Sequence, residues 1–565
     1  MPNKNEATEI SPLLHGTSKV RPESDDAPPG SRPSGSGISG PANGTAKAGD
    51  EEQVKDHVTE YQGMPDVKAR LKYFLPAIAI GIFLSAADQT LIVTMYGKIG
   101  SDLKALNKTS WVSTAYFLTI SSFQPLYGKL SDIFGRKPAL LFGYAVFGIG
   151  CLFCGLARNM NELIAARAFA GIGGGGMTTV VSILMSDIVP LRERGTWQGI
   201  INIIYAAGAG CGAPLGGILA DLFSWRWAFL AQAPLCALAI VSVSLTLHLP
   251  AKESGGWKDK LARVDFLGAF VLISAVFALL LGLDRGSNVS WSIPIAYVPL
   301  ALSFPLFILF GLIEHKYAAE PFAPSRIIWD RGLVACYLCN FFSYGGYLAV
   351  LFYLPLFFQA VDGYTATQAS VRLLPAIVAS VSGSLSGGLI MQKTGKYYWL
   401  TVIAYTMLLA GVLTVMLCAD FLVNNTYGIA VGLVLSGVGS GIGVTSSLIG
   451  LIANAAQADQ AVATACSYLF RSLGSIVGLS LAATVVQQSL RNQLQDHLSS
   501  GKDAEEIAEK VRQSLEFIKT LRPEVKEVVR QCYSRATRDG FGLMLSIVFF
   551  SMLSAFYVRE KRLSK

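Results

Sequence analysis

The sequence has few charged residues for its length. Asp, Glu, Lys and Arg make up 15% of its 565 residues, whereas they make up about 25% of a typical soluble protein. Mean hydropathy is +0.46, and many apolar stretches have about the 20 residues of a membrane-spanning helix. These features exclude an ordinary soluble domain and predict a polytopic membrane protein. The net charge of +8 is then expected in cytoplasmic loops, not on a nucleic-acid-binding surface.

Histidine and cysteine are too few or too badly placed for a metal site or a disulfide framework. The five His residues include no pair at ligand spacing. All Cys residues except Cys532 fall inside apolar stretches, so disulfides are not expected. The pairs Cys151/Cys154 and Cys336/Cys339 have CxxC spacing, but no further ligand lies nearby. We expect no metal and no cofactor.

The glycine run from Gly173 to Gly176 does not have the context of a phosphate-binding loop. It lies inside an apolar stretch, with no preceding strand and no following Lys-Ser/Thr pair. Small residues in a membrane helix instead permit close helix packing. No hydrolase constellation appears either, so the sequence predicts a protein that is not an enzyme.

Fourteen apolar stretches predict an all-α membrane protein with fourteen transmembrane helices. Their lengths fit helices, because a strand of a membrane barrel needs only about 10 residues with an alternating pattern. The expected spans are 73–95, 110–127, 138–157, 162–186, 197–220, 228–248, 265–283, 293–313, 333–358, 369–391, 398–419, 427–452, 461–487 and 540–557.

Residues 1–70 are expected to form a disordered cytosolic tail, because they are polar and rich in Pro, Gly and Ser. We see no cleavable signal peptide, so the first span would serve as the anchor. The segment Glu9-Ile-Ser-Pro-Leu13-Leu14 resembles an acidic dileucine signal, which sorting adaptors bind on vacuolar and lysosomal proteins. The alternative is a chance match, because the pattern is short.

Two independent patterns indicate that both termini are cytoplasmic. Lys and Arg gather in the short loops after spans 2, 4, 6, 8 and 10 and at the C-terminus, as the positive-inside rule requires. The opposite loops are poorer in Lys and Arg, except 96–109 and the long segment 488–540. The sequons at Asn107, Asn288 and Asn424 all fall on the non-cytoplasmic side, where they are candidates for glycosylation.

An internal repeat relates spans 9–14 to spans 1–6. The stretch 128–137 is echoed by 388–396, with Gln392 in place of Asp132. A second glycine pattern is echoed at nearly the same offset, with Gly171, Gly173 and Gly175 answered by Gly437, Gly439 and Gly441. Two six-helix halves with a site between them form a transporter plan. The expected domains are a tail 1–70, a six-helix bundle 71–250, two inserted helices with linkers 251–332, a second six-helix bundle 333–557 and a cytosolic tail 558–565.

The polar segment 488–540 is expected to form one or two amphipathic helices on the non-cytoplasmic face. Ile507, Val511, Leu515 and Ile518 recur there at helical intervals among many charges. A structural cap and a binding site both fit this pattern, and we favour the cap.

The ordered motifs resemble the major facilitator superfamily, in particular its fourteen-span drug:proton antiporter branch. The stretch 128–137 resembles that superfamily's signature loop between spans 2 and 3, and 163–171 resembles its span 4 motif. The segments Asp88-Gln-Thr90, Trp225-Arg-Trp227 and Phe470-Arg471-x-x-Gly474 also resemble this branch. The antiporter motif of span 5 is similar to Gly208-Ala-Gly-Cys-Gly212-Ala-Pro214-Leu-Gly216-Gly217, although Ala213 stands where a glycine usually precedes the proline.

Asp88 is the first candidate for substrate binding or proton coupling. A charged Asp near the centre of a membrane helix costs roughly 2.5–3.5 kcal/mol on insertion scales, so it should face a cavity or a partner. Burial favours the neutral form of a carboxyl group, which lets it take up and release a proton. The alternative is a structural hydrogen-bond acceptor that holds span 1 to a neighbouring helix.

Arg167 and Arg471 are further candidates for the same roles. Arg167 has no counterpart in the second half, where Leu433 stands at the repeat offset. The family resemblance implies that Arg167 biases the protonation of a nearby carboxylate. The alternatives are a salt bridge or carbonyl clamp for Arg167 and a packing clamp for Arg471.

Gly128, Asp132, Gly135, Arg136 and Lys137 are expected to gate transport and not to bind substrate. Asp132 lies at the cytoplasmic end of span 2, where it can pair with a loop cation or a helix N-terminus. A latch of this kind holds one access state and must break in the other.

Within the branch, the N-terminal tail and the motifs of spans 1 and 5 resemble fungal vacuolar basic amino acid permeases. That resemblance implies an antiporter that moves Lys, His and Arg from the cytosol into the acidic vacuole in exchange for protons. Its partners would be cationic amino acids, protons and membrane lipid, with no nucleic acid. Two alternatives stay open: a plasma-membrane exporter of drugs or toxic compounds, and a nutrient sensor that uses the fold without net transport.

Replacing Leu13 and Leu14 by Ala should redirect the protein away from the vacuolar membrane, because an adaptor would lose its apolar anchor. Fluorescence microscopy of the tagged full chain measures the location. A tagged chain with Ser18→Ala, outside the dileucine pattern, is the control. An unchanged location of the Leu13→Ala/Leu14→Ala variant would refute the sorting role.

Overall fold

Long α-helices account for nearly all regular structure in the computed structural model. It describes residues 67, 71–92, 95–105, 110–249, 260, 263–288, 291–316, 325–364, 366–422, 424–497 and 522–563. Apart from the isolated bridge between Ala419 and Asn424, the regular secondary structure of these residues is helical. The all-α membrane fold class is thereby confirmed. The helices form one unit that spans Glu60–Lys565.

The helices follow one another along the chain with short connections. In the first half they are α2 (Leu71–Leu91), α3 (Tyr96–Asp102), α4 (Ser110–Phe134), α5 (Arg136–Leu156), α6 (Met160–Ile188), α7 (Arg194–Leu222), α8 (Trp225–Leu230) and α9 (Gln232–Thr246). The remaining helices are α11 (Phe266–Asn288), α12 (Pro294–Lys316), α13 (Ser325–Ile328), α14 (Arg331–Ala360), α15 (Ala366–Val371), α16 (Leu374–Thr394), α17 (Tyr398–Cys418), α18 (Thr426–Asn454), η3 (Gln457–Asp459), α19 (Gln460–His497) and α22 (Pro523–Ala555).

Thirteen helices of the described residues are long and apolar enough to cross a membrane. Each overlaps one of the expected spans. The remaining expected span, 110–127, lies in α4, a 25-residue helix that is not among the thirteen. Ser, Thr and Gln recur along α4 and make it less apolar than its neighbours. The count of fourteen spans therefore stays a prediction.

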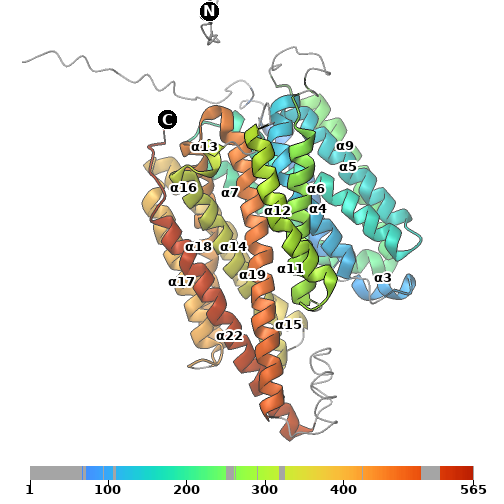
Figure 1. The fold of residues 1–565 in the computed structure, drawn as a ribbon, viewed down its shortest axis with the longest axis vertical. Helices are drawn as coiled ribbons and strands as arrows, with labels where there is room; N and C mark the ends of the chain where they lie inside the picture. The colour runs from blue at the N-terminus through green and yellow to red at the C-terminus, as the bar shows by residue number, and fades with distance from the viewer. Residues whose placement is uncertain are drawn as a thin grey trace, which may run out of the picture. The chain divides into compact units, whose positions relative to one another are not determined.

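The N-terminal helices α2–α9 pack around apolar cores of their own. One core gathers residues of α2, α4, α5, α6 and α9, and a second lies nearer α3 and α8. The C-terminal helices α14–α22 share a separate and larger core. Figure 1 shows the two groups side by side, with α7, α4 and α6 lying near α16, α14 and α19. The domain boundaries proposed from the repeat remain a prediction.

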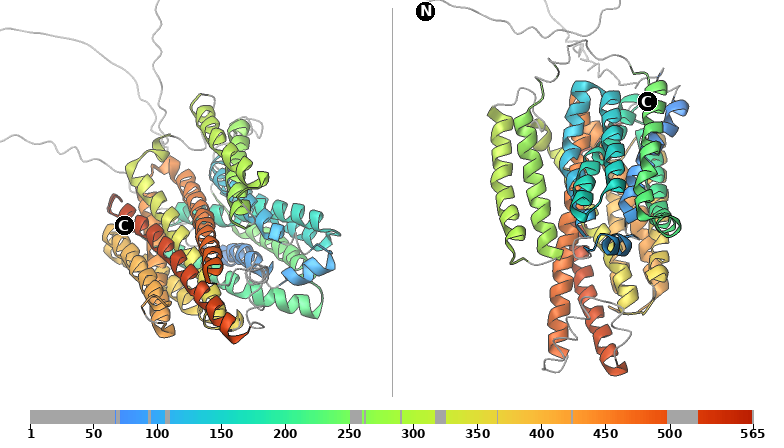
Figure 2. Two further views of the ribbon diagram at one scale, coloured as in Figure 1. Left: turned by 60° about the horizontal axis from the view of Figure 1, so that its bottom comes forward. Right: turned by 90° about the vertical axis from the view of Figure 1, so that its right-hand side faces the viewer.

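The inserted pair α11 and α12 lies against the seam between the two groups. Its apolar core includes residues of α4 and α19, one helix from each group. Ser480 Oγ donates to Leu283 O (3.4 Å), and Trp291 Nε1 donates to Thr484 Oγ1 (3.2 Å). Figure 2 shows the pair on one side of the helical unit.

The two glycine patterns occupy equivalent places in the two groups. Gly171 on α6 faces α4, where a Cβ would lie 2.5 Å from Tyr116 O. Gly437 on α18 faces α16, where a Cβ would lie 2.6 Å from Ala376 O. Gly439 packs on α17 in the same way that Gly173 packs on α5. The expected role of these glycines in close helix packing is confirmed.

Helices α19 and α22 run past the other helices at one end of the unit (Figure 1). We name this end after Asp102, which lies at the end of α3. There Ser489 Oγ donates to Asp539 Oδ2 (2.6 Å), which ties α19 to α22. The expected amphipathic segment 488–540 is thus partly continuous with these two helices, while Ile507, Val511, Leu515 and Ile518 lie outside the described residues.

The opposite end, which we name after Arg192, carries the C-terminus. Leu563 N donates to Gly395 O (3.1 Å), and Tyr397 Oη donates to Arg559 O (2.7 Å). These contacts hold the last residues against the connection between α16 and α17. Burial raises the pKa of Tyr397 to about 12, so its hydroxyl stays protonated and remains a donor at physiological pH.

Gly478→Ala should lower the apparent Tm of the purified protein. The α14–α19 contact has no room for a methyl group, because a Cβ at Gly478 would overlap the backbone of Gly345. Gly311→Ala is the matched control, since a Cβ at Gly311 meets nothing within 4 Å. Thermal unfolding in detergent measures both variants; equal Tm values would contradict the packing argument.

Candidate functional site

A cavity of about 570 Å³ lies between the N-terminal and C-terminal helices. Its walls come from α2, α4, α6 and α7 on one side and from α14, α16, α18 and α19 on the other. Its polar side chains include Gln89, Thr90, Gln124, Asn202, four tyrosines (Tyr205, Tyr344, Tyr347, Tyr468) and several serines. Among the described residues that line it, Arg471 is the one with a formal charge.

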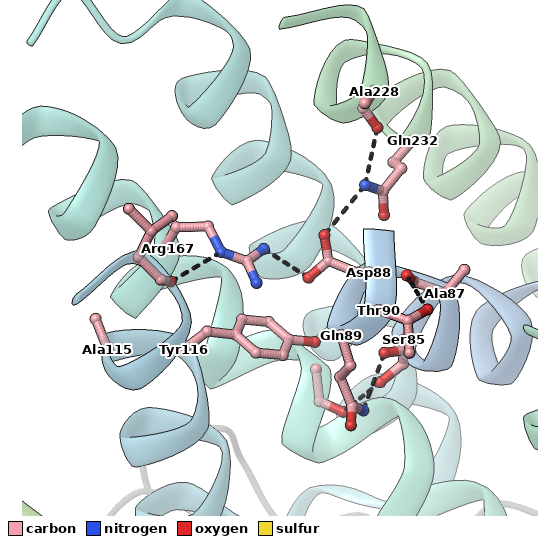
Figure 3. A network of polar contacts seen from close by, with 12 residues as sticks. Ser85, Ala87, Asp88, Gln89, Thr90, Ala115, Tyr116, Arg167, Ala228 and Gln232 are labelled. Atoms are coloured by element: carbon pink, nitrogen blue, oxygen red, sulfur yellow. Dashed lines mark hydrogen bonds and ion pairs between the residues drawn. The ribbon is translucent and has the colours of Figure 1, made fainter. Parts of the chain in front are cut away.

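Asp88 and Arg167 form an ion pair beside this cavity, inside the N-terminal helices (Figure 3). Arg167 Nη1 on α6 lies 2.6 Å from Asp88 Oδ2 on α2. The side chains are 0% and 1% exposed. The sequence analysis expected Asp88 to face a cavity or a partner, and it faces a partner. Neither residue lines the cavity.

Further groups complete the surroundings of the pair. Gln232 Nε2 on α9 donates to Asp88 Oδ1 (3.1 Å) and to Ala228 O (3.0 Å), as Figure 3 shows. Arg167 Nε donates to Val112 O (3.3 Å), and its guanidinium lies 4.1 Å from the ring centroid of Tyr116. The pair thus connects α2, α4, α6 and α9. A buried ion pair needs such additional hydrogen bonds to offset its desolvation cost.

The pair is chemically suited to store and release one proton. Protonation of Asp88 removes the charge that faces Arg167 and leaves a buried cation without its counter-charge. Breaking a buried pair in this way costs about 3–5 kcal/mol. Such a cost is large enough to shift the balance between two conformations.

The residues after Asp88 connect this pair to the cavity. Gln89 and Thr90 both line the cavity. Tyr205 Oη donates to Gln89 Oε1 (3.0 Å), and Thr90 Oγ1 donates to Ala209 O (2.9 Å). Both bonds reach α7, so a shift of α2 at Asp88 would be felt in the cavity wall.

The glycines of the expected antiporter motif hold α7 against α2. A Cβ at Gly208 would lie 2.5 Å from Phe83 O, and one at Gly212 or Gly216 would overlap the backbone of α2 near Ala87 or Leu91. Pro214 and Gly217 lie in the same helix, with Pro214 in its interior. The structure therefore gives Gly208, Gly212 and Gly216 a close-packing place, while their role in transport stays a prediction.

The expected gating residues form an ion network at the Arg192 end. Arg136 lies 2.6 Å from both Asp132 and Asp187. Gly135 has φ 96°, a conformation that glycine adopts without strain. Gly128 packs against α19, where a Cβ would lie 2.7 Å from Ala465 Cβ. The network therefore lies on one helix group, directly at its contact with the other.

Lys137, the last of the expected gating residues, points elsewhere. Its Nζ donates to Ser244 O on α9 (2.7 Å). This bond joins α5 to α9 within the N-terminal helices and does not reach the other group.

Contacts that the sequence analysis did not identify join the two groups at the Arg192 end. Arg192 donates from Nε to Gln392 O and from Nη2 to Lys393 O (2.8 Å), at the last turn of α16. Thr196 Oγ1 donates to Gln392 Oε1 (2.9 Å). Asn202 Nδ2 donates to Ser384 Oγ (2.7 Å) deeper in the seam. These bonds close the cavity toward this end.

Arg471 lies on the cavity wall opposite Asp88. Its Nε donates to Asn340 Oδ1 on α14 (3.2 Å), and its guanidinium stacks near the rings of Tyr344 and Tyr468. The side chain is 6% exposed. The structure therefore does not bring Arg471 together with Asp88 and Arg167 and places it in a different helix group.

The remaining expected sites are described only in part. Asn424 is exposed and donates to Asp362 Oδ1 (2.8 Å) at the Asp102 end. Asn288 is the last residue of α11, and Asn107 lies outside the described residues, as do Glu9, Leu13 and Leu14. No group of three or more potential metal ligands occurs among the described residues.

A polytopic helical protein with two helix groups and a cavity at their seam has the architecture of a membrane transporter. The chain belongs to the Major Facilitator Superfamily, whose family model matches residues 78–479. It is therefore a transporter and not an enzyme.

Curated relatives cover most of the chain. It is 38% identical over 491 residues to the vacuolar membrane amino acid uptake transporter fnx2 of Schizosaccharomyces pombe, covering 86% of this chain and 84% of that one. It is 37% identical to the multidrug resistance protein fnx1 of the same organism, with coverages of 86% and 92%. It is 32% identical to the vacuolar basic amino acid transporter 2 of Saccharomyces cerevisiae, with coverages of 81% and 98%.

The fold is also similar to a solved transporter. The proton:xylose symporter XylE matches with a TM-score of 0.56 and 13% identity, over 88% of this chain and 98% of that one. This likeness supports the fold.

The Asp88–Arg167 pair should give a strong coupling in a double-mutant cycle. Asp88→Asn leaves Arg167 buried without a counter-charge and should destabilise the protein by about 3–5 kcal/mol. The double variant Asp88→Asn/Arg167→Gln should recover much of this loss, because neither charge remains. Thermal unfolding measures all three variants. Additive losses would contradict the coupling.

Proposed function

We propose that this protein is a proton antiporter that moves the basic amino acids Lys, His and Arg from the cytosol into the vacuole. The buried Asp88–Arg167 pair next to the cavity carries the proposal, because it provides one titratable group where a charge is costly. The relatives support the substrate class, since two of them are named as vacuolar amino acid or basic amino acid transporters.

The cycle we propose couples Asp88 to the access state. When the protein opens to the acidic lumen, Asp88 gains water contact and takes up a proton. The protonated carboxyl no longer holds Arg167, and the N-terminal helices rearrange toward the cytosol-facing state. Release of the proton to the neutral cytosol restores the pair, which favours the return with a bound amino acid.

The energetics fit such an exchange. Moving one monovalent cation in for one proton out is electroneutral. Each unit of pH difference then supplies about 1.4 kcal/mol, which corresponds to about tenfold accumulation.

In this proposal the Arg192 end faces the cytosol, together with both termini. The ion network of Arg136 with Asp132 and Asp187, and the bonds from Arg192 to α16, then act as the cytosolic gate. Asn107, Asn288 and Asn424 would lie in the lumen as glycosylation candidates, and Glu9, Leu13 and Leu14 would direct the chain to the vacuole.

Export of drugs or other toxic compounds at the plasma membrane is the second candidate. Four tyrosines line the cavity, and aromatic walls accept many apolar ligands. One relative is named as a multidrug resistance protein. A sensor that binds amino acids without moving them is a third reading, of a different class.

Vacuolar vesicles that contain the protein should accumulate labelled lysine, histidine and arginine when ATP energises them. A protonophore should abolish the uptake, and Asp88→Asn should abolish it at matched protein levels. Asp102→Asn is the control, because its ion pair with Arg226 is exposed.

Three outcomes separate the candidates. Equal uptake by vesicles that lack the protein would refute the proposed function. Drug sensitivity on deletion, with the protein at the cell surface, would favour the exporter. Amino acid binding without flux would favour the sensor. Flux retained by Asp88→Asn would remove this carboxylate from the mechanism.

A further inference from the structure

The guanidinium of Arg471 lies on the cavity wall with part of its hydrogen-bonding capacity unused. Nε is bonded to Asn340 Oδ1 (3.2 Å), while Nη2 is buried and has no acceptor among the described residues. The side chain is 6% exposed. Leaving such a donor unsatisfied is costly, more so when it is charged. The molecule therefore keeps an unmatched cation next to an empty space.

The surroundings hold this cation in place without neutralising it. Asn340 is itself fixed, since its Nδ2 donates to Cys336 O (2.9 Å) and to Ser467 Oγ (3.3 Å). The rings of Tyr344 and Tyr468 lie 5.2 and 4.9 Å from the guanidinium carbon. Amide and aromatic groups stabilise a cation, yet they leave its net charge in place.

The N-terminal wall of the cavity has the opposite character. It offers carboxamides, including Gln89 on α2 and Gln124 on α4, and carries no formal charge among its described lining residues. Arg167, the cation of that helix group, is already paired with Asp88. The charge of the cavity wall is thus concentrated on the C-terminal side.

We propose that Arg471 binds the α-carboxylate of the transported amino acid, with Asn340 as its positioning residue. An amino acid carries a carboxylate whatever its side chain, and a guanidinium binds carboxylates with two parallel donors. This inference rests on the proposed function, since it names the group by which that substrate is held.

The geometry also sets what the site selects. The cationic side chain of lysine or arginine meets carboxamide oxygens and tyrosine faces, because the described lining provides no Asp or Glu. The carboxylate, by contrast, meets a buried charge that is otherwise unsatisfied. Analogues that lack the carboxylate should therefore lose more affinity than analogues that lack the side-chain charge.

Binding of matched ligand pairs to the purified full chain tests this inference. The pairs are lysine with cadaverine, arginine with agmatine and histidine with histamine, each differing by the carboxylate. The wild-type protein should bind each amino acid at least 100-fold more tightly than its decarboxylated partner. Norleucine, which keeps the carboxylate and lacks the side-chain charge, should bind more tightly than cadaverine.

Arg471→Gln provides the second arm of the test. It should lose at least 100-fold in lysine affinity while its affinity for cadaverine is unchanged or improved, and Arg471→Lys should recover part of the loss. Arg491→Gln, an exposed position on the same helix, is the matched control. A packing clamp would instead weaken both ligands of a pair alike.

The outcomes distinguish this inference from the proposed function. Equal wild-type affinity for lysine and cadaverine would overturn the role of Arg471 and leave basic amino acid transport standing. Wild-type protein that binds none of the three amino acids would overturn both. Because the ligand pairs are compared on the wild-type protein, an Arg471→Gln variant that fails to fold leaves the test decisive.

Discussion

The N-terminal helices depend on a charge pair that has almost no contact with solvent. Asp88 and Arg167 connect α2 to α6, and Gln232 and the carbonyl of Val112 connect the pair to α9 and α4. An ion pair at this depth is stabilising only while both charges are present. The position of α2, and therefore the face that it turns to the cavity, follows from whether Asp88 is charged.

The two helix groups treat their buried arginines differently. Arg167 is neutralised by a carboxylate, and its environment is complete. Arg471 is held by an amide and two aromatic rings, with one nitrogen unsatisfied. The first arrangement suits a group that changes its protonation, and the second suits a group that waits for an anion. Related halves have thus diverged in charge while they kept the same helix packing.

The sequence was sufficient for the helices and for their close contacts, because both depend on local composition. Apolar length predicted the spans, and repeated glycines marked where backbones touch. The partner of Asp88 could not be read in advance, since contacts between distant segments depend on packing. Gln232 gave one usable signal, a polar residue inside an apolar stretch. The bonds of Arg192 gave none, because they end on backbone carbonyls, which every residue has.

Those carbonyl acceptors have a consequence for how the protein responds to its compartment. Arg192 bonds to the last turn of α16, and Thr196 bonds to the amide of Gln392. None of these acceptors gains or loses a proton at any pH that a cell maintains. This part of the closure therefore has the same strength on a neutral membrane as on an acidic organelle. Sensitivity to acidity has to enter through the carboxylates, and so the seal and the sensor are separate devices.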